Sequence, residues 1–141
     1  MVLVDTPVWS LSLRRKSVDL SDYERLLTHT LYELVRRSQV QLLGSIRQEV
    51  LSGIREDSQF RRIRDHLGDF DNVKLDIRDY EEAARISNLC RNSGIVGSPV
   101  DMLMCSAALR YDSEIFTTDR DFLLYTRVAN IRLLALPAVH D

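Results

Sequence analysis

The sequence has few of the residues that interrupt or cross-link a chain. Its 141 residues include only five glycines, three prolines and two cysteines. Repeats and low-complexity tracts are also missing, so the sequence predicts one domain over residues 1–141 rather than two joined by a linker. A chain of this length can bury a full core without cross-links. We therefore expect Cys90 and Cys105 to be buried, reduced thiols, with a disulfide as the alternative.

Long apolar runs and a targeting segment are absent as well. No apolar stretch approaches the roughly 18 residues that indicate a membrane span. The N-terminus also lacks the basic region followed by an apolar stretch that marks a secretory signal. His29, His66 and His140 do not cluster in sequence with cysteine or with one another, which argues against zinc. We expect a cytoplasmic protein that does not associate with membranes.

Lysine is nearly absent, whereas arginine is common. The net charge of −2 argues by itself against a nucleic-acid-binding protein, but Lys16 and Lys74 are accompanied by 17 arginines. The planar guanidinium of arginine makes two-point contacts with phosphates and carboxylates. The basic clusters at 14–16, 36–37 and 61–64 could be solvated helix faces paired with nearby acids. Together they could also form a basic rim around an acidic centre.

Short apolar runs alternate along the chain with segments of helical periodicity. This alternation predicts an α/β fold with a parallel sheet covered by helices on both faces. Capping residues followed by proline predict helix starts at Thr6-Pro7 and at Ser98-Pro99. The predicted strands cover residues 2–4, 40–44, 72–75, 114–118 and 131–136.

Four carboxylates occupy sequence positions that a parallel sheet would bring to one edge. Asp5 follows the first predicted strand and Asp119 the fourth, while Asp101 and Glu49 lie near the starts of two helices. In open parallel sheets, sites form outside the carboxyl ends of the strands. Several like charges in one pocket require a cation, and carboxylates without histidine favour Mg²⁺ or Mn²⁺. Such a cluster can activate water for phosphodiester hydrolysis.

Each acid also has a simpler interpretation. Asp5 or Asp119 could cap the helix that follows it. Asp101 could complement the dipole of its helix, and Glu49 could be a surface charge facing a nearby arginine. Spacing alone leaves these alternatives open.

Four motifs, in order, resemble those of PIN-domain proteins, and among these the VapC-type toxins of toxin–antitoxin pairs. The motifs are VDTPVWSLSLRR, IRQEVLSGI, SPVDMLMCSAAL and IFTTDRDF, within a likeness that covers about residues 2–136. The resemblance implies a three-layer α/β/α domain with a parallel five-stranded sheet in the order 3-2-1-4-5. It also implies an Mg²⁺- or Mn²⁺-dependent endoribonuclease that forms homodimers and is inhibited by a cognate VapB-like antitoxin protein.

The resemblance also assigns roles to individual residues. The metal-binding and catalytic acids carried over are Asp5, Glu49, Asp101 and Asp119. Thr117 falls where the family often has a hydroxyl beside the metal, and Thr6 and Asp121 are expected around the site. Asp121 could compete with Asp119, but the spacing from Thr117 favours Asp119. Pro7 departs from the family, because many relatives carry serine there.

The expected function is therefore that of a toxin that cleaves cellular RNA by metal-activated water. The alternative is a non-catalytic RNA- or protein-binding module of the same fold, which would not bind metal tightly. A phosphoacceptor receiver domain has a similar size and pattern. The chemistry of such a domain needs a lysine late in the chain, whereas the last lysine here is Lys74. The sequence therefore argues against a receiver domain.

Overall fold

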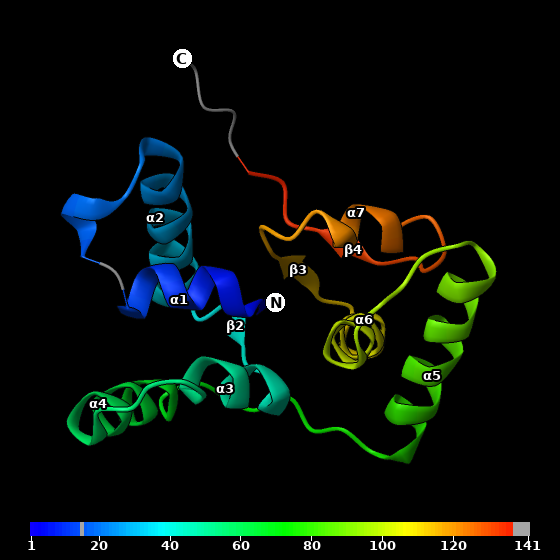
Figure 1. Ribbon diagram of the computed structural model, residues 1–141, viewed down its shortest axis with the longest axis horizontal. Coiled ribbons are helices and arrows are strands. Elements are labelled where there is room, and N and C mark those ends of the chain that lie inside the picture. Colours follow the sequence, from blue (N-terminus) through cyan, green and yellow to red (C-terminus); the bar gives the residue numbers. More distant parts are fainter. Residues whose placement is uncertain (15, 137–141) are drawn as a thin grey trace.

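A parallel sheet lies at the centre of the computed structural model, which describes residues 1–14 and 16–136 (Figure 1). Its strands are β1 (Val2–Val4), β2 (Val40–Gln41), β3 (Glu114–Phe116) and β4 (Arg132–Leu133), in the order β2-β1-β3-β4. All neighbouring strands run parallel. Val4 is the partner of Phe116, so β1 and β3 end side by side. This register places the residues after both strands at one edge of the sheet.

The predicted strand at 72–75 is wrong for the described residues, which form four strands rather than five. Only a single parallel bridge joins Asn72 to Leu42, beyond β2, where the predicted order placed this strand. The residues after Asn72 do not continue this pairing. Arg110 and Tyr111, near the end of α6 (Pro99–Tyr111), both donate side-chain hydrogen bonds to the Lys74 carbonyl. An acceptor held by side chains is not available to extend a strand ladder.

Helices flank the sheet, as predicted. Besides α6, the helices are α1 (Thr6–Arg14), α2 (Asp22–Arg36), α3 (Gly44–Leu51), α4 (Asp57–Leu67), α5 (Ile77–Asn92) and α7 (Asp121–Tyr125), and a 3₁₀ turn covers Ser17–Asp19. Figure 1 shows the first four helices on one side of the view and α5, α6 and α7 on the other. No helix within residues 1–14 and 16–136 combines the length and hydrophobicity that a membrane span requires.

The helix starts follow local capping chemistry. The Ser98 hydroxyl accepts the Asp101 N–H, and Pro99 is the first residue of α6, as predicted. At α1 the prediction was one residue late, because the helix begins at Thr6 itself. α7 begins at Asp121, two residues after Asp119, which the sequence offered as a possible cap. In both places an aspartate carboxylate accepts a backbone N–H at the helix start.

Trp9 connects α1 to strand β1 through a hydrogen bond and buried packing. Its side chain is buried, and its indole N–H donates to the Val4 carbonyl at 3.1 Å. Its ring meets Phe70 edge to face, with centroids 5.1 Å apart. Because Val4 directly precedes Asp5, this contact also fixes the backbone that carries the first acid. Cys90 and Cys105 are free and buried, as predicted.

Candidate active site

Asp5 is buried at the point where β1 ends and α1 begins. Its N–H continues the sheet by donating to the Phe116 carbonyl at 2.9 Å. Its Oδ1 accepts the Thr6 N–H at 2.8 Å, and its Oδ2 accepts the Thr117 hydroxyl at 2.7 Å. Only 5% of the residue is exposed. Asp5 therefore does cap its own helix locally, but the same carboxylate also reaches across to the residue that follows β3.

Thr117 connects Asp5 to the loop before α7. Its hydroxyl donates to Asp5 and accepts the Asp119 N–H at 3.0 Å. The Asp119 carboxylate in turn accepts the Asp121 N–H at 2.9 Å through Oδ1. Asp119 is thus linked directly to Thr117, whereas Asp121 stands one step further along the chain of hydrogen bonds. These contacts tie the backbone of Asp119, rather than that of Asp121, directly to Thr117.

Asp101 lies in the first turn of α6 and accepts a hydrogen bond that the sequence did not predict. The hydroxyl of Tyr125, at the end of α7, donates to Asp101 Oδ2 at 2.7 Å. Tyr125 is almost fully buried, and a buried tyrosine hydroxyl usually requires a polar partner. The apolar residues around Tyr125 in this short helix are a sequence signal that its hydroxyl would be buried and need a partner. Nothing in the sequence indicates that the partner lies 24 positions earlier.

Glu49 lies on α3 and is exposed as a whole residue. Partial burial of its carboxyl is still the main cause of a raised pKa, and the charges of Asp5 and Asp101 raise it further. The Thr6 hydroxyl opposes this shift. Within the described part of the chain, that buried hydroxyl oxygen has no partner at full hydrogen-bonding geometry, so its effect on Glu49 is that of a nearby dipole rather than of a formed hydrogen bond. Thr6 therefore presents an unsatisfied polar atom on the side of Glu49.

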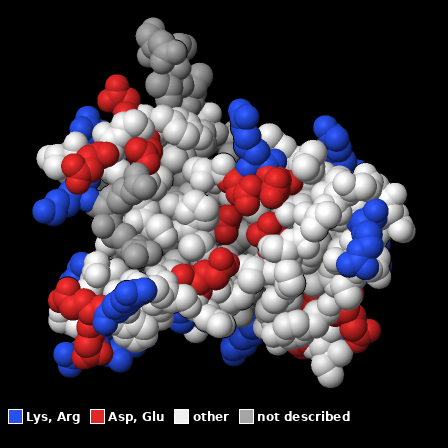
Figure 2. Space-filling model, viewed as in Figure 1, with Lys and Arg blue, Asp and Glu red and all other residues white. Residues whose placement is uncertain are grey.

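The acids affect one another's charge. Burial is the largest cause of the raised pKa of Asp5, and the charges of Asp101 and Asp119 add to it. Burial also raises the pKa of Asp101, with contributions from Asp119 and Asp121. Hydrogen bonds oppose both shifts, from Thr117 and Thr6 at Asp5 and from Tyr125 and Ser98 at Asp101. The structure thus brings the four predicted acids within electrostatic reach, and Figure 2 shows acidic side chains gathered in the middle of one face.

The donor set suits a hard divalent cation. It consists of carboxylate oxygens, which Mg²⁺ and Mn²⁺ prefer, and a cation would relieve the repulsion that raises these pKa values. As placed, however, no three His, Cys, Asp or Glu side chains in the described ranges are close enough together to hold one ion. His140, one of the three histidines considered above, lies outside those ranges. The metal-binding roles therefore remain predictions.

Several arginines of the predicted basic clusters pair with acids close by in the chain. Arg36 and Arg37 both lie within 4.0 Å of Glu33. Arg61 pairs with Asp57 on the same helix. These pairs fit solvated helix faces better than a free phosphate-binding rim. In the cluster at 14–16, Arg15 and the side chain of Arg14 lie outside the described residues.

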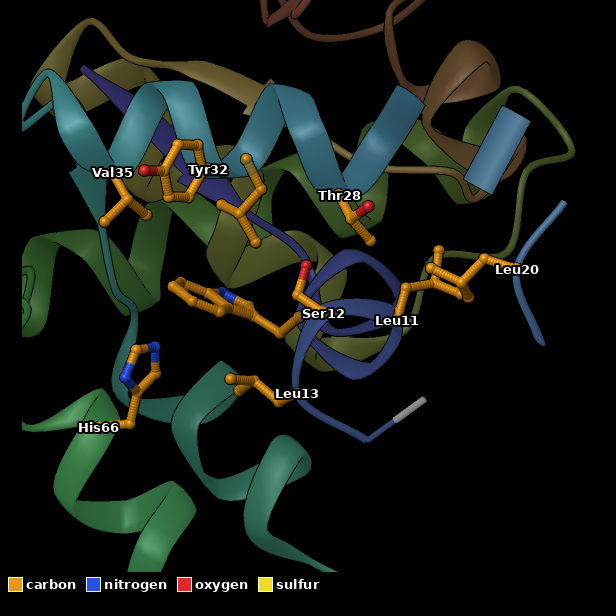
Figure 3. Close-up of a pocket in the computed structure, with 10 residues that line it drawn as sticks. Leu11, Ser12, Leu13, Leu20, Thr28, Tyr32, Val35 and His66 are labelled. Atoms are coloured by element: carbon orange, nitrogen blue, oxygen red, sulfur yellow. The ribbon is translucent and has the colours of Figure 1, made fainter. Parts of the chain in front are cut away.

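A second feature, which the sequence did not predict, is an apolar groove between α1 and α2. It encloses about 400 Å³. Figure 3 shows Tyr32 and Val35 on α2 facing Leu13 on α1 and His66 on α4 across this space. The other lining residues are Trp9, Leu11, Ser12, Leu20, Thr28 and Leu31. Because α1 directly follows the buried Asp5 and also lines the groove, the acidic site and the groove meet on one helix.

Comparison with known proteins assigns the family. The PIN domain model matches residues 2–128. No curated protein sequence matches the chain. Solved structures similar to the chain include a toxin–antitoxin complex from Klebsiella pneumoniae, with a TM-score of 0.67 at 18% identity, covering 86% of this chain and 90% of that one. VapBC2 from Rickettsia felis, bound to a fragment of promoter DNA, has a TM-score of 0.73 at 12% identity, covering 95% of this chain and 98% of that one.

Two further structures also match nearly the full length of this chain. FitAcB from Neisseria gonorrhoeae gives a TM-score of 0.67 at 15% identity, covering 96% of this chain and 97% of that one. VapBC-1 from nontypeable Haemophilus influenzae gives 0.68 at 12% identity, with 95% and 97% covered. Identities this low establish the fold alone, whereas the family model matches most of the chain. Together with the parallel sheet and flanking helices, that match shows that the chain belongs to the PIN domain family.

Proposed function

We propose that this chain is a metal-dependent endoribonuclease and the toxin of a toxin–antitoxin pair, acting on cellular RNA in the cytoplasm. One observation carries the proposal. The bond from Thr117 to Asp5 joins the ends of two neighbouring strands, and Glu49, Asp101 and Asp119 lie within electrostatic reach of that bond. The family match supports a nuclease, and the similar toxin–antitoxin complexes support a toxin.

In this proposal Asp5, Glu49, Asp101 and Asp119 hold Mg²⁺ or Mn²⁺. When bound, the metal lowers the pKa of a water molecule and offsets the charge of the phosphodiester. The chain's own residues hold the ligands in place. Thr117 orients the Asp5 carboxylate and, by accepting the Asp119 N–H, fixes the start of the loop that carries Asp119. Burial of Asp5 keeps competing water away from that carboxylate.

The substrate follows from the same charges. An acidic centre repels the phosphates of RNA, so a bound cation is needed before a polyanion can approach. Contacts from arginine to the RNA backbone would then position the strand without reading its sequence.

The antitoxin has a surface suited to it in the groove between α1 and α2. We propose that an amphipathic helix of the antitoxin lays its apolar side against Leu13, Leu31 and Val35, a recognised mode of peptide binding. A basic side chain of the antitoxin would then reach the acids and replace the charge of the metal. The shared helix α1 makes both contacts available to one partner.

Homodimerisation is also part of the proposal. Exposed apolar side chains are candidates for the contact between two copies, and two of them, Ile77 and Tyr80, lie on the first turn of α5. Analytical ultracentrifugation of the chain alone would test this.

Growth arrest on induction tests the toxin function. Induced wild-type chain is expected to stop growth and leave RNA fragments with common cut sites, whereas Asp5→Asn should do neither. Asp112→Asn is the matched control, because Asp112 pairs with Arg132 and its left-handed backbone (φ 51°) also suits asparagine. Equal toxicity of wild type and Asp5→Asn would overturn the assignment.

The spacing of the acids favours one alternative, a non-catalytic RNA- or protein-binding module of the same fold. The described side chains do not form a ready-made set of three metal ligands. That alternative predicts no RNA fragments from the wild-type chain and a silent Asp5→Asn substitution.

A further inference from the structure

Tyr125 occupies a position that neither its sequence context nor the family match assigns to the site. It is the last residue of α7, and its hydroxyl donates to Asp101 Oδ2 at 2.7 Å. Only 1% of Tyr125 is exposed. The hydrogen bond is partly buried, since Asp101 is half-buried, and it joins α7 to the start of α6.

Packing fixes the ring from which this hydroxyl projects. Phe122, fully buried one turn earlier, meets the Tyr125 ring edge to face with centroids 5.0 Å apart. The Tyr125 carbonyl also accepts the N–H groups of Val128 and Ala129, so the backbone on its far side is held as well. A ring held in this way presents its hydroxyl at one place, where the Asp101 carboxylate accepts its hydrogen bond.

The two ends of α7 donate hydrogen bonds to two different acids. At the beginning of the helix, the Asp121 N–H donates to the Asp119 carboxylate. At its end, Tyr125 donates to the Asp101 carboxylate. One short helix thus donates a hydrogen bond to each of the two carboxylates.

We propose that Tyr125 is a positioning residue that orients Asp101 for the metal. This inference rests on the proposed function, because it takes Asp101 to be a metal ligand. Ligating carboxylates are commonly fixed by such hydrogen bonds, and removing the partner typically weakens metal binding by about 10- to 100-fold. The competing explanation is that Tyr125 only fills the core and satisfies its own hydroxyl with the nearest acceptor.

Mn²⁺ binding by the full chain, measured by calorimetry after chelation and dialysis, separates the two explanations. Tyr125→Phe keeps the ring and removes only the hydroxyl. Tyr111→Phe is the matched control, because the Tyr111 hydroxyl donates to the Lys74 carbonyl, away from the acids. We expect the Mn²⁺ dissociation constant to rise about 10-fold or more in Tyr125→Phe and to stay unchanged in Tyr111→Phe. Both variants should show a similar small fall in thermal midpoint.

Equal Mn²⁺ affinity in wild type and Tyr125→Phe would overturn this inference while leaving the proposed function intact. No Mn²⁺ binding by the wild type would overturn both.

A second measurement leaves Tyr125 in place. The Tyr125 signal can be assigned in chains labelled with ¹³C at the tyrosine Cζ, by replacing the four other tyrosines with phenylalanine one at a time. Adding Mg²⁺ should shift the Tyr125 signal and leave that of Tyr111 unmoved, since only the first donates to a metal ligand. An unmoved Tyr125 signal at saturating Mg²⁺ would contradict the proposal.

Discussion

The Thr117 hydroxyl donates a 2.7 Å hydrogen bond to the Asp5 carboxylate across 112 positions of sequence. The same hydroxyl accepts the Asp119 N–H, so one oxygen atom links two of the proposed metal ligands. Thr117 is therefore the residue whose removal should disturb the site most without removing an acid.

Replacing Thr117 with valine should lower the rate of RNA cleavage by about 10- to 100-fold, because the Asp5 carboxylate loses its orienting donor. The cost in folding stability should be about 1 kcal/mol, typical of one lost hydrogen bond. Thr117→Ser keeps the hydroxyl and serves as the matched control, with near wild-type rates. Cleavage assays and denaturant titrations measure the two effects separately, and an equally active Thr117→Val chain would show that the bond has no part in the reaction.

The raised pKa values predict how the metal-free chain responds to pH. Asp5, Glu49 and Asp101 hold their protons more tightly when folded than when unfolded. The stability that they contribute is complete below the ordinary carboxyl pKa of about 4 and is lost as pH rises through the raised values. In the presence of EDTA, Asp5→Asn should therefore gain thermal stability over wild type as pH increases from 4 to 7. A constant difference between the two melting curves would show that Asp5 carries no such penalty.

Mg²⁺ should reverse that trend. A cation that binds the folded chain but not the unfolded one stabilises it by mass action, and it does so best when the acids are ionised. We expect the rise in thermal midpoint on adding Mg²⁺ to be larger at pH 7 than at pH 5, and smaller in Asp101→Asn at both. An Mg²⁺ effect of the same size in Asp101→Asn would place the cation elsewhere.

The groove can be tested through Tyr32, which is 62% exposed and so can be changed with little effect on folding. Tyr32→Ala should weaken binding of an antitoxin encoded beside this chain by at least about 1 kcal/mol, a typical loss for an aromatic anchor. Tyr23→Ala is the control, because Tyr23 lies exposed on the same helix outside the groove. Surface plasmon resonance would measure both, and equal losses would argue against groove binding.

Asp79 should matter for stability but not for chemistry. It is buried, accepts a hydrogen bond from Arg110 and also accepts the Asp76 N–H. Arg110→Met removes the positive partner and should destabilise the fold by about 1–3 kcal/mol, the usual cost of leaving a buried polar group unsatisfied. Mn²⁺ affinity should stay unchanged. Weaker Mn²⁺ binding in Arg110→Met would mean that α5 and α6 couple to the site.

Local chemistry made some features predictable and left others hidden. Ser98 followed by proline indicates a helix start, because both the cap and the fixed proline backbone act within one turn. The neighbouring positions of β1 and β3 follow from the family pattern. The missing fifth strand depends on Arg110 and Tyr111, far away in sequence. The contact of Tyr125 with Asp101 is equally non-local, and periodicity marks such a residue only as part of the core.

Cleavage of a labelled RNA by the purified chain tests the central claim most directly. Wild-type protein with Mg²⁺ or Mn²⁺ is expected to cut the RNA internally, and cleavage should stop with EDTA and fall at least about 100-fold in Asp5→Asn. The Asp112→Asn chain should cut as wild type does. Cleavage that persists in EDTA, or equal rates for wild type and Asp5→Asn, would contradict the account.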